Sequence, residues 1–126
     1  MRRFLEAAIG MHPLDRLPPR AALQPQAMPQ LLPHLVLTKV EYWPEQVRFK
    51  LTVIGQATAD TLGLHLANRY MDEVQATELP SLSHPIEDRQ QVVSEGLALY
   101  RFGDPRMRHN ADFVRIELCH TPLADD

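Results

Sequence analysis

The chain of 126 residues contains one cysteine, Cys119, and carries no concentrated charge of either sign. A lone cysteine excludes an internal disulfide and makes a zinc ribbon implausible. The net charge is −3, and lysine and arginine do not gather beyond Arg2–Arg3 and a loose group between residues 101 and 108. Nucleic-acid binding domains usually show a basic patch, so we expect no nucleic-acid partner.

Long apolar runs are also missing. No stretch approaches the ~18 consecutive apolar residues that cross a bilayer. The N-terminus begins with positive charge, but Glu6 interrupts the apolar residues that follow, and no long hydrophobic region comes after it. This pattern argues against a signal peptide. We therefore predict a cytoplasmic protein with no membrane partner.

Motifs of catalysis and metal binding are absent as well. The chain has only five glycines, no glycine-rich phosphate loop and no G-x-S-x-G sequence. Its six histidines show no spacing typical of metal ligands. The acidic pairs Asp72–Glu73 and Glu87–Asp88 are adjacent in predicted helices, where neighbours point about 100° apart and do not converge on a substrate. We predict no catalytic residue, no metal site and no enzyme.

What the sequence does contain is a strict alternation of apolar and polar residues from Val47 to Val53, ending at Gly55. Side chains alternate between the two faces of a strand, so Val47, Phe49, Leu51 and Val53 are predicted to share one buried face. A second strand precedes it over residues 35–42. The short turn between the two strands predicts an antiparallel hairpin with one wet face.

The chain divides into two regions, and the hairpin belongs to the second. Residues 1–30 are predicted to form a short N-terminal helix followed by a connector, because five of the eleven prolines lie between residues 13 and 30. Residues 31–126 are predicted to form one domain. Its helical middle covers residues 56–66, 70–74 and 85–95, and strands follow at residues 97–102 and 112–120. The order of strands, helices and strands predicts an α+β fold.

In this order the chain resembles the PAS domain family, and specifically its small standalone bacterial members. The segments that carry the resemblance are 17–20, Pro25 with Met28, 32–37, 53–56, Gly63, 69–73 and 117–123. The resemblance implies an antiparallel sheet with short helices packed on one face and an N-terminal helical cap. It also implies a non-catalytic sensory or signalling module.

PAS sheets have five strands, whereas four are found in this sequence. The last strand is therefore missing or truncated, or its place is filled in another way, for example by a partner chain that adds to an open edge. The sensory interpretation requires that the two hairpins form one sheet and that Phe49 and Leu51 face the helices.

The resemblance implies that a ligand would bind between the sheet and the helices. The alternative is a dry core, since protein interiors are close-packed by default. Tyr70 would supply a polar group, and His120 would be either a haem or metal ligand or, as we favour, a strand-end histidine with a local hydrogen bond. No cofactor is identified. The predicted cavity residues are Phe49, Leu51, Val53, Tyr70, Leu97, Leu99, Val114, Ile116, Leu118 and His120.

In PAS-like proteins, N-terminal helices of this kind commonly lie at the dimer contact, and the resemblance implies the same for this chain. The alternative is that the helix docks on the protein's own sheet. The predicted function is a sensory module that binds a small molecule or a signalling protein as a homodimer. The alternative function is a ligand-free dimerisation or interaction domain. The predicted dimer-contact residues are Phe4, Leu5, Ala8, Ile9 and Met11.

Overall fold

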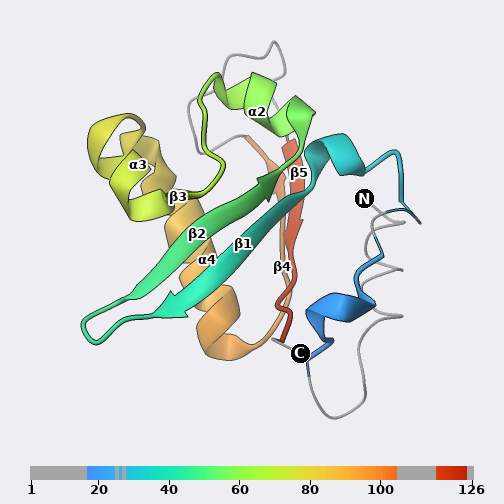
Figure 1. The fold of residues 1–126 in the computed structure, drawn as a ribbon, viewed down its shortest axis with the longest axis horizontal. Coiled ribbons are helices and arrows are strands. Elements are labelled where there is room, and N and C mark those ends of the chain that lie inside the picture. The colour runs from blue at the N-terminus through green and yellow to red at the C-terminus, as the bar shows by residue number, and fades with distance from the viewer. Residues whose placement is uncertain (1–16, 25, 27, 105–115, 125–126) are drawn as a thin grey trace.

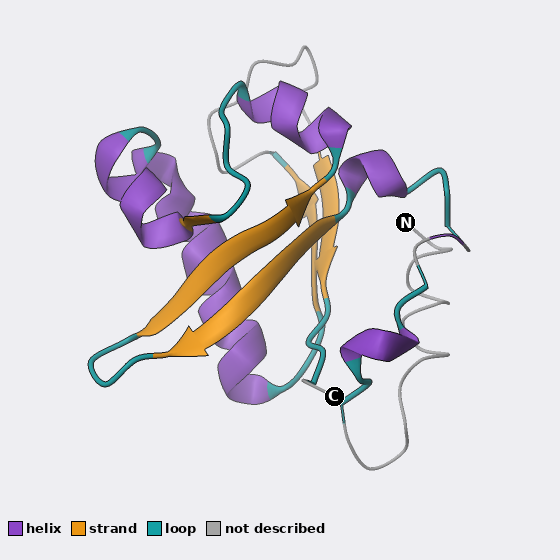
Figure 2. Ribbon diagram, viewed as in Figure 1, coloured by secondary structure: helices purple, strands orange, loops and turns teal. Residues whose placement is uncertain are grey.

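A computed structural model describes residues 17–24, 26, 28–104 and 116–124 and shows an α+β fold (Figures 1 and 2). The predicted N-terminal helix lies outside the described residues. No helix in the described ranges is both long and apolar enough to cross a bilayer. The elements are η1 (Arg20–Ala22), η3 (Leu32–His34), β1 (Val36–Tyr42), β2 (Val47–Ile54), α2 (Gln56–Leu62), β3 (Arg69–Tyr70), α3 (Met71–Thr77), η4 (Pro80–Leu82), α4 (Ser83–Glu95), β4 (Leu99–Gly103) and β5 (Ile116–His120).

The predicted hairpin is confirmed. Strands β1 and β2 pair antiparallel, and the Trp43 amide donates to the Gln46 carbonyl at 2.9 Å to close the turn. Strand β3 pairs with the other side of β2, with Tyr70 opposite Lys50. The strand order is therefore β1-β2-β3, and β1 is an edge strand that pairs with no other described strand.

A β-bulge interrupts the alternation of β2. Leu37 pairs with Val53 but Thr38 pairs with Leu51, so Thr52 is an extra residue in β2. An extra residue exchanges the two faces beyond it. Val53 is consequently 43% exposed, while Ile54 packs against the core. The prediction that Val53 shares the buried face of Phe49 and Leu51 is wrong for this reason.

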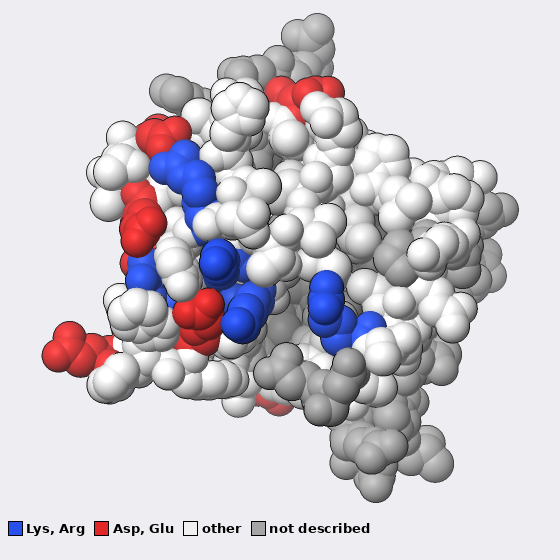
Figure 3. Space-filling view, in the orientation of Figure 1, with Lys and Arg blue, Asp and Glu red and all other residues white. Residues whose placement is uncertain are grey.

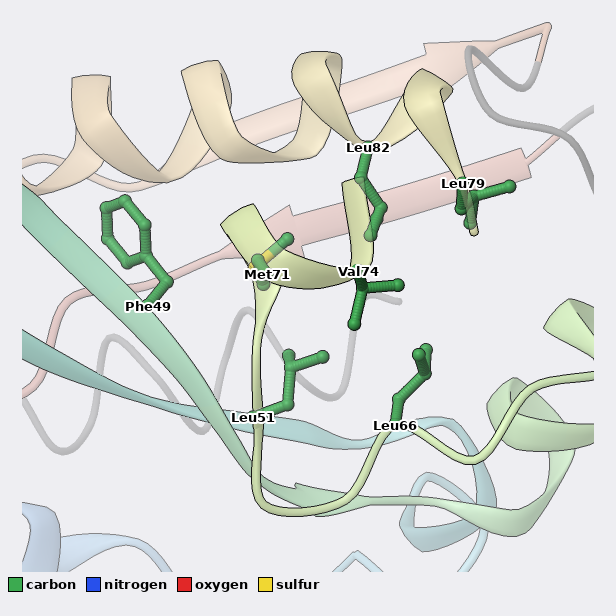
Figure 4. Packing of buried hydrophobic residues seen from close by; sticks show 7 residues of the cluster. All are labelled: Phe49, Leu51, Leu66, Met71, Val74, Leu79 and Leu82. Carbon is green, nitrogen blue, oxygen red and sulfur yellow. The ribbon is translucent and has the colours of Figure 1, made fainter. Parts of the chain in front are cut away.

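Phe49 and Leu51 face inward, as predicted, and are 2% and 4% exposed. Figure 4 shows Phe49 beside Met71 and under α4. Short helical segments cover this face of the sheet, which confirms that part of the predicted fold. The cluster of buried apolar side chains is Phe49, Leu51, Leu66, Met71, Val74, Leu79 and Leu82.

Gly55 is required where β2 ends beside η3. A Cβ atom at this position would fall inside contact distance of the backbone carbonyls of Leu32 and Pro33. The Gly55 amide donates to the Leu35 carbonyl at 2.7 Å, so the two backbones run in direct contact. Only a residue without a side chain allows this approach.

The two hairpins do not form one sheet. Strands β4 and β5 pair only with each other, and they make a second, two-stranded sheet that we call the β4–β5 ribbon. The prediction of one continuous antiparallel sheet is wrong for the described residues. Helix α4 ends at Gly96, in the left-handed conformation, and β4 begins only at Leu99. Leu97, predicted as a strand residue, lies in this connection and is 64% exposed.

Candidate functional site

The predicted cavity residues do not come together at one site. Phe49 and Leu51 belong to the filled core, whereas Val53 and Leu97 are exposed. Val114 lies outside the described residues. Four more of the predicted residues lie together on one face of the β4–β5 ribbon and are half-buried there. They are Leu99, Ile116, Leu118 and His120. A hollow of about 190 Å³ is found instead at the hairpin turn, lined by Trp43, Pro44, Glu45 and Gln46.

Tyr70 lies on the face of the sheet opposite Phe49 and Leu51, because it pairs with Lys50 across β2 and β3. Its prediction as a polar group inside the core is wrong. The Tyr70 hydroxyl donates to Glu41 at 2.9 Å, and the Trp43 indole donates to the same carboxylate at 3.1 Å. The hydrogen bond from Trp43, followed by the one from Tyr70, lowers the pKa of Glu41. The bond to Glu41 in turn raises the pKa of Tyr70.

Arg48 closes this outer-face cluster. Its guanidinium carbon lies 3.8 Å from the ring centre of Tyr70 and 4.7 Å from that of Trp43. The same guanidinium contacts Glu73 at 2.9 Å and Asp72 at 3.1 Å, at the start of α3. Figure 3 shows the basic and acidic side chains side by side over β1–β3 and α3. Since its groups pair with one another, this cluster fastens the hairpin to α3 rather than offering an open site.

A second polar cluster lies where α4 meets both sheets, and we call it the α4 cluster. Its members are Asp88, Arg89, Arg101 and His120. The Asp88 carboxylate, buried in α4, accepts two hydrogen bonds from Arg101 of β4, at 2.6 and 2.8 Å. The next residue, Arg89, donates from Nε to the Thr38 hydroxyl of β1 at 3.3 Å and from Nη1 to the Pro85 carbonyl at 3.2 Å. Helix α4 therefore links the three-stranded sheet to the β4–β5 ribbon through neighbouring residues.

His120 belongs to this α4 cluster. It pairs with Leu99 and lies diagonally from Arg101 on the ribbon face that meets α4. Burial, and next the positive charge of Arg89, lower the pKa of His120 to about 4. The neighbouring Cys119 points to the opposite face, and burial raises the pKa of its thiol. Within the described residues no group of three His, Cys, Asp or Glu side chains could hold a metal ion.

The low pKa of His120 predicts a loss of stability in mild acid. The folded state resists protonation that the unfolded chain accepts below pH 6.5, so stability falls as the pH drops from about 6.5 towards 4. Among the described residues, the charged groups that act on the imidazole are Asp88 and Arg89 of α4 and Arg101 of β4. We expect about 2 kcal/mol of stability to be lost between pH 7 and pH 5.

Urea unfolding of the wild type and of His120→Gln at both pH values measures this loss. The variant has no imidazole to protonate, so it is expected to lack the corresponding part of the pH dependence. If the free energy of unfolding depended on pH equally in the two proteins, His120 would not be held neutral in the folded state.

No family model matches the chain, and neither a curated protein nor a solved structure matches it. The predicted dimer-contact residues Phe4 to Met11 lie outside the described residues. Sequence reasoning missed both polar clusters. In the α4 cluster, the polar side chains of Arg89 and His120 lie where α4 meets the two sheets, so this cluster is the candidate site.

Proposed function

We propose that this chain is a non-catalytic interaction domain that forms a homodimer by antiparallel addition of β1 to β1 of a second copy. The observation that carries the proposal is the lateral edge of β1, a seven-residue strand with which no described strand other than β2 pairs. An uncovered edge strand presents a row of amide and carbonyl groups that pair with another strand.

The hairpin turn determines which groups of β1 point outward. Because the Trp43 amide bonds to Gln46, the alternate residues Glu41 and Lys39 bond across to β2. The amides and carbonyls of Thr38, Val40 and Tyr42 then point to the lateral edge. A second strand could pair with these residues without disturbing a bond to β2.

The charges of β1 select one register. With Val40 opposite Val40 of the second copy, Lys39 lies opposite Glu41 twice, which is favourable. A shift of two residues in one direction sets Lys39 opposite Lys39, and in the other direction it sets Glu41 opposite Glu41. Like charges directly opposite each other destabilise a strand pair, so we propose the register centred on Val40.

Reversal of one charge tests this dimer. In Lys39→Glu or in Glu41→Lys, both symmetric pairs become like-charged, and we expect dimerisation weaker by roughly 2 kcal/mol, or about 30-fold in Kd. A mixture of the two variants restores opposite charges at both positions, so the heterodimer is expected to form in preference to either homodimer. Sedimentation equilibrium of each variant and native mass spectrometry of the mixture measure these outcomes.

Glu95→Lys is the control, because it makes the same change of charge as Glu41→Lys at an exposed residue at the end of α4. Its dimerisation is expected to match that of the wild type. A monomeric wild type would refute the proposal. An unchanged dimer in Lys39→Glu that is lost on deletion of residues 1–12 would place the contact on the predicted N-terminal helix instead.

The second candidate function is a PAS-like cytoplasmic sensory module of bacterial type that binds a small ligand and signals to a partner protein. Its requirement for one shared sheet is not met in the described residues. What favours it is the half-buried α4 cluster with Arg89 and His120, because polar side chains between two layers are a common place for a ligand. A thermal shift with a panel of small molecules tests this candidate.

A further inference from the structure

We propose that the α4 cluster is a binding site for a small carboxylate, which Arg89 would hold with the side chains of His120 and Arg101 beside it. This inference is independent of the homodimer, since it concerns the face of the fold where α4 meets β1 and the β4–β5 ribbon. It rests on the balance of charge, the access of the guanidinium and the placement of the three side chains.

Two arginines of the cluster, Arg89 and Arg101, share one described carboxylate, that of Asp88. Arg101 binds Asp88 through two hydrogen bonds, whereas both hydrogen bonds of Arg89 go to neutral oxygens, of Thr38 and Pro85. Burial lowers the pKa of Arg89 to about 10, and the charge of Asp88 offsets only part of this effect. His120 is neutral at pH 7. One bound monoanion would compensate the charge of Arg89.

The guanidinium also keeps donors that a ligand could use. Nε and Nη1 of Arg89 each donate one hydrogen bond, and Nη2 has no partner among the described residues. No described side-chain nitrogen or oxygen is both buried and without a hydrogen-bond partner. Arg89 Nη2 must therefore reach solvent, and the same reasoning applies to the ring nitrogens of His120. Arg89 and His120 are both half-buried, so neither side chain is enclosed completely.

Three elements place these donors in one region. Arg89 follows Asp88 on α4, Asp88 binds Arg101 on β4, and His120 lies diagonally from Arg101 across the ribbon. The charges of Arg89, Asp88 and Arg101 all act on His120, so the four groups are close. A planar guanidinium matches a carboxylate through two parallel hydrogen bonds, and a single excess charge suits a monoanion.

Thermal unfolding in sodium acetate and in sodium chloride at equal ionic strength tests the site. If acetate is present at about ten times its Kd, it should raise the Tm by about 5 °C more than chloride does. Acetate also stabilises proteins without binding, so the comparison between variants decides. Arg89→Gln is expected to abolish the difference between the two salts, and Arg20→Gln, at an exposed arginine, is expected to keep it.

Two further measurements test the site even if Arg89→Gln does not fold. Arg89→Lys keeps the charge but loses the planar guanidinium, so the acetate response is expected to fall several-fold. In the wild type, the NMR signals of the Arg89 Nε–H and of the His120 ring should shift on addition of acetate but not of chloride. An equal response to both salts, an acetate response that persists in Arg89→Gln, or a response to phosphate alone would overturn the proposal.

Discussion

Phe49→Ala is expected to lower the free energy of unfolding by about 4 kcal/mol, the largest effect of any single change considered for this chain. Phe49 is 2% exposed and points from β2 towards Met71 and α4 (Figure 4). Truncation removes most of an aromatic side chain at the centre of the core. The seven-residue helix α3, which packs there, cannot shift far enough to fill the cavity because β3 ties it to β2.

The matched control is Phe102→Ala, since Phe102 lies on β4 and is 66% exposed. Its removal is expected to change stability by no more than about 0.5 kcal/mol. Urea unfolding followed by the fluorescence of Trp43 measures both variants. Equal costs for the two phenylalanines would mean that the inner face of β2 is not the centre of the core.

The elements and the inner face of the hairpin were predictable because their signals are local. Alternation over Val47–Leu51 depends only on the period of a strand, and Gly63 and Gly96 end helices by a backbone conformation that glycine adopts readily. The position of Val53 was not predictable in this way. The bulge at Thr52 arises from pairing with Leu37 and Thr38, and no residue of β2 alone reveals it.

The division into two sheets depends on contacts between distant parts of the chain, which a local pattern does not contain. A hairpin forms between neighbouring strands, but whether two hairpins share a sheet is decided by the layer between them. Here α4 meets both, through Arg89 to Thr38 and through Asp88 to Arg101. Tyr70 was misplaced for a similar reason, since only its pairing with Lys50 determines its face.

The α4 cluster was missed because its members look ordinary in the sequence. The acidic pair Glu87–Asp88 is typical of a solvated helix face, yet Asp88 is 6% exposed. A signal was available in retrospect. If residues 97–102 form a strand that packs against the preceding helix, the single arginine on its inner face, Arg101, requires a buried acidic partner.

The second large effect is expected for Arg101→Gln, which removes the two charged hydrogen bonds to the buried Asp88 carboxylate. Loss of one partner of a buried ion pair costs about 3–5 kcal/mol. We expect about 3 kcal/mol, because the Arg101 side chain is 37% exposed and solvent already weakens the pair. The control is Arg69→Gln, whose ion pair with Glu78 is about one third exposed on both sides and should cost less than 1 kcal/mol.

A double variant separates the pair from its surroundings. Asp88→Asn with Arg101→Gln replaces two charges by two neutral amides, so it is expected to be more stable than Arg101→Gln alone, with a coupling energy of roughly 2 kcal/mol. Strict additivity of the two changes would contradict a direct interaction. Because the pair fastens the β4–β5 ribbon to α4, amide hydrogen exchange in Arg101→Gln should quicken in β4 and β5 while β1 and β2 keep their protection. A uniform increase across both sheets would mean that the two sheets unfold as one unit and that this ion pair is not what joins them.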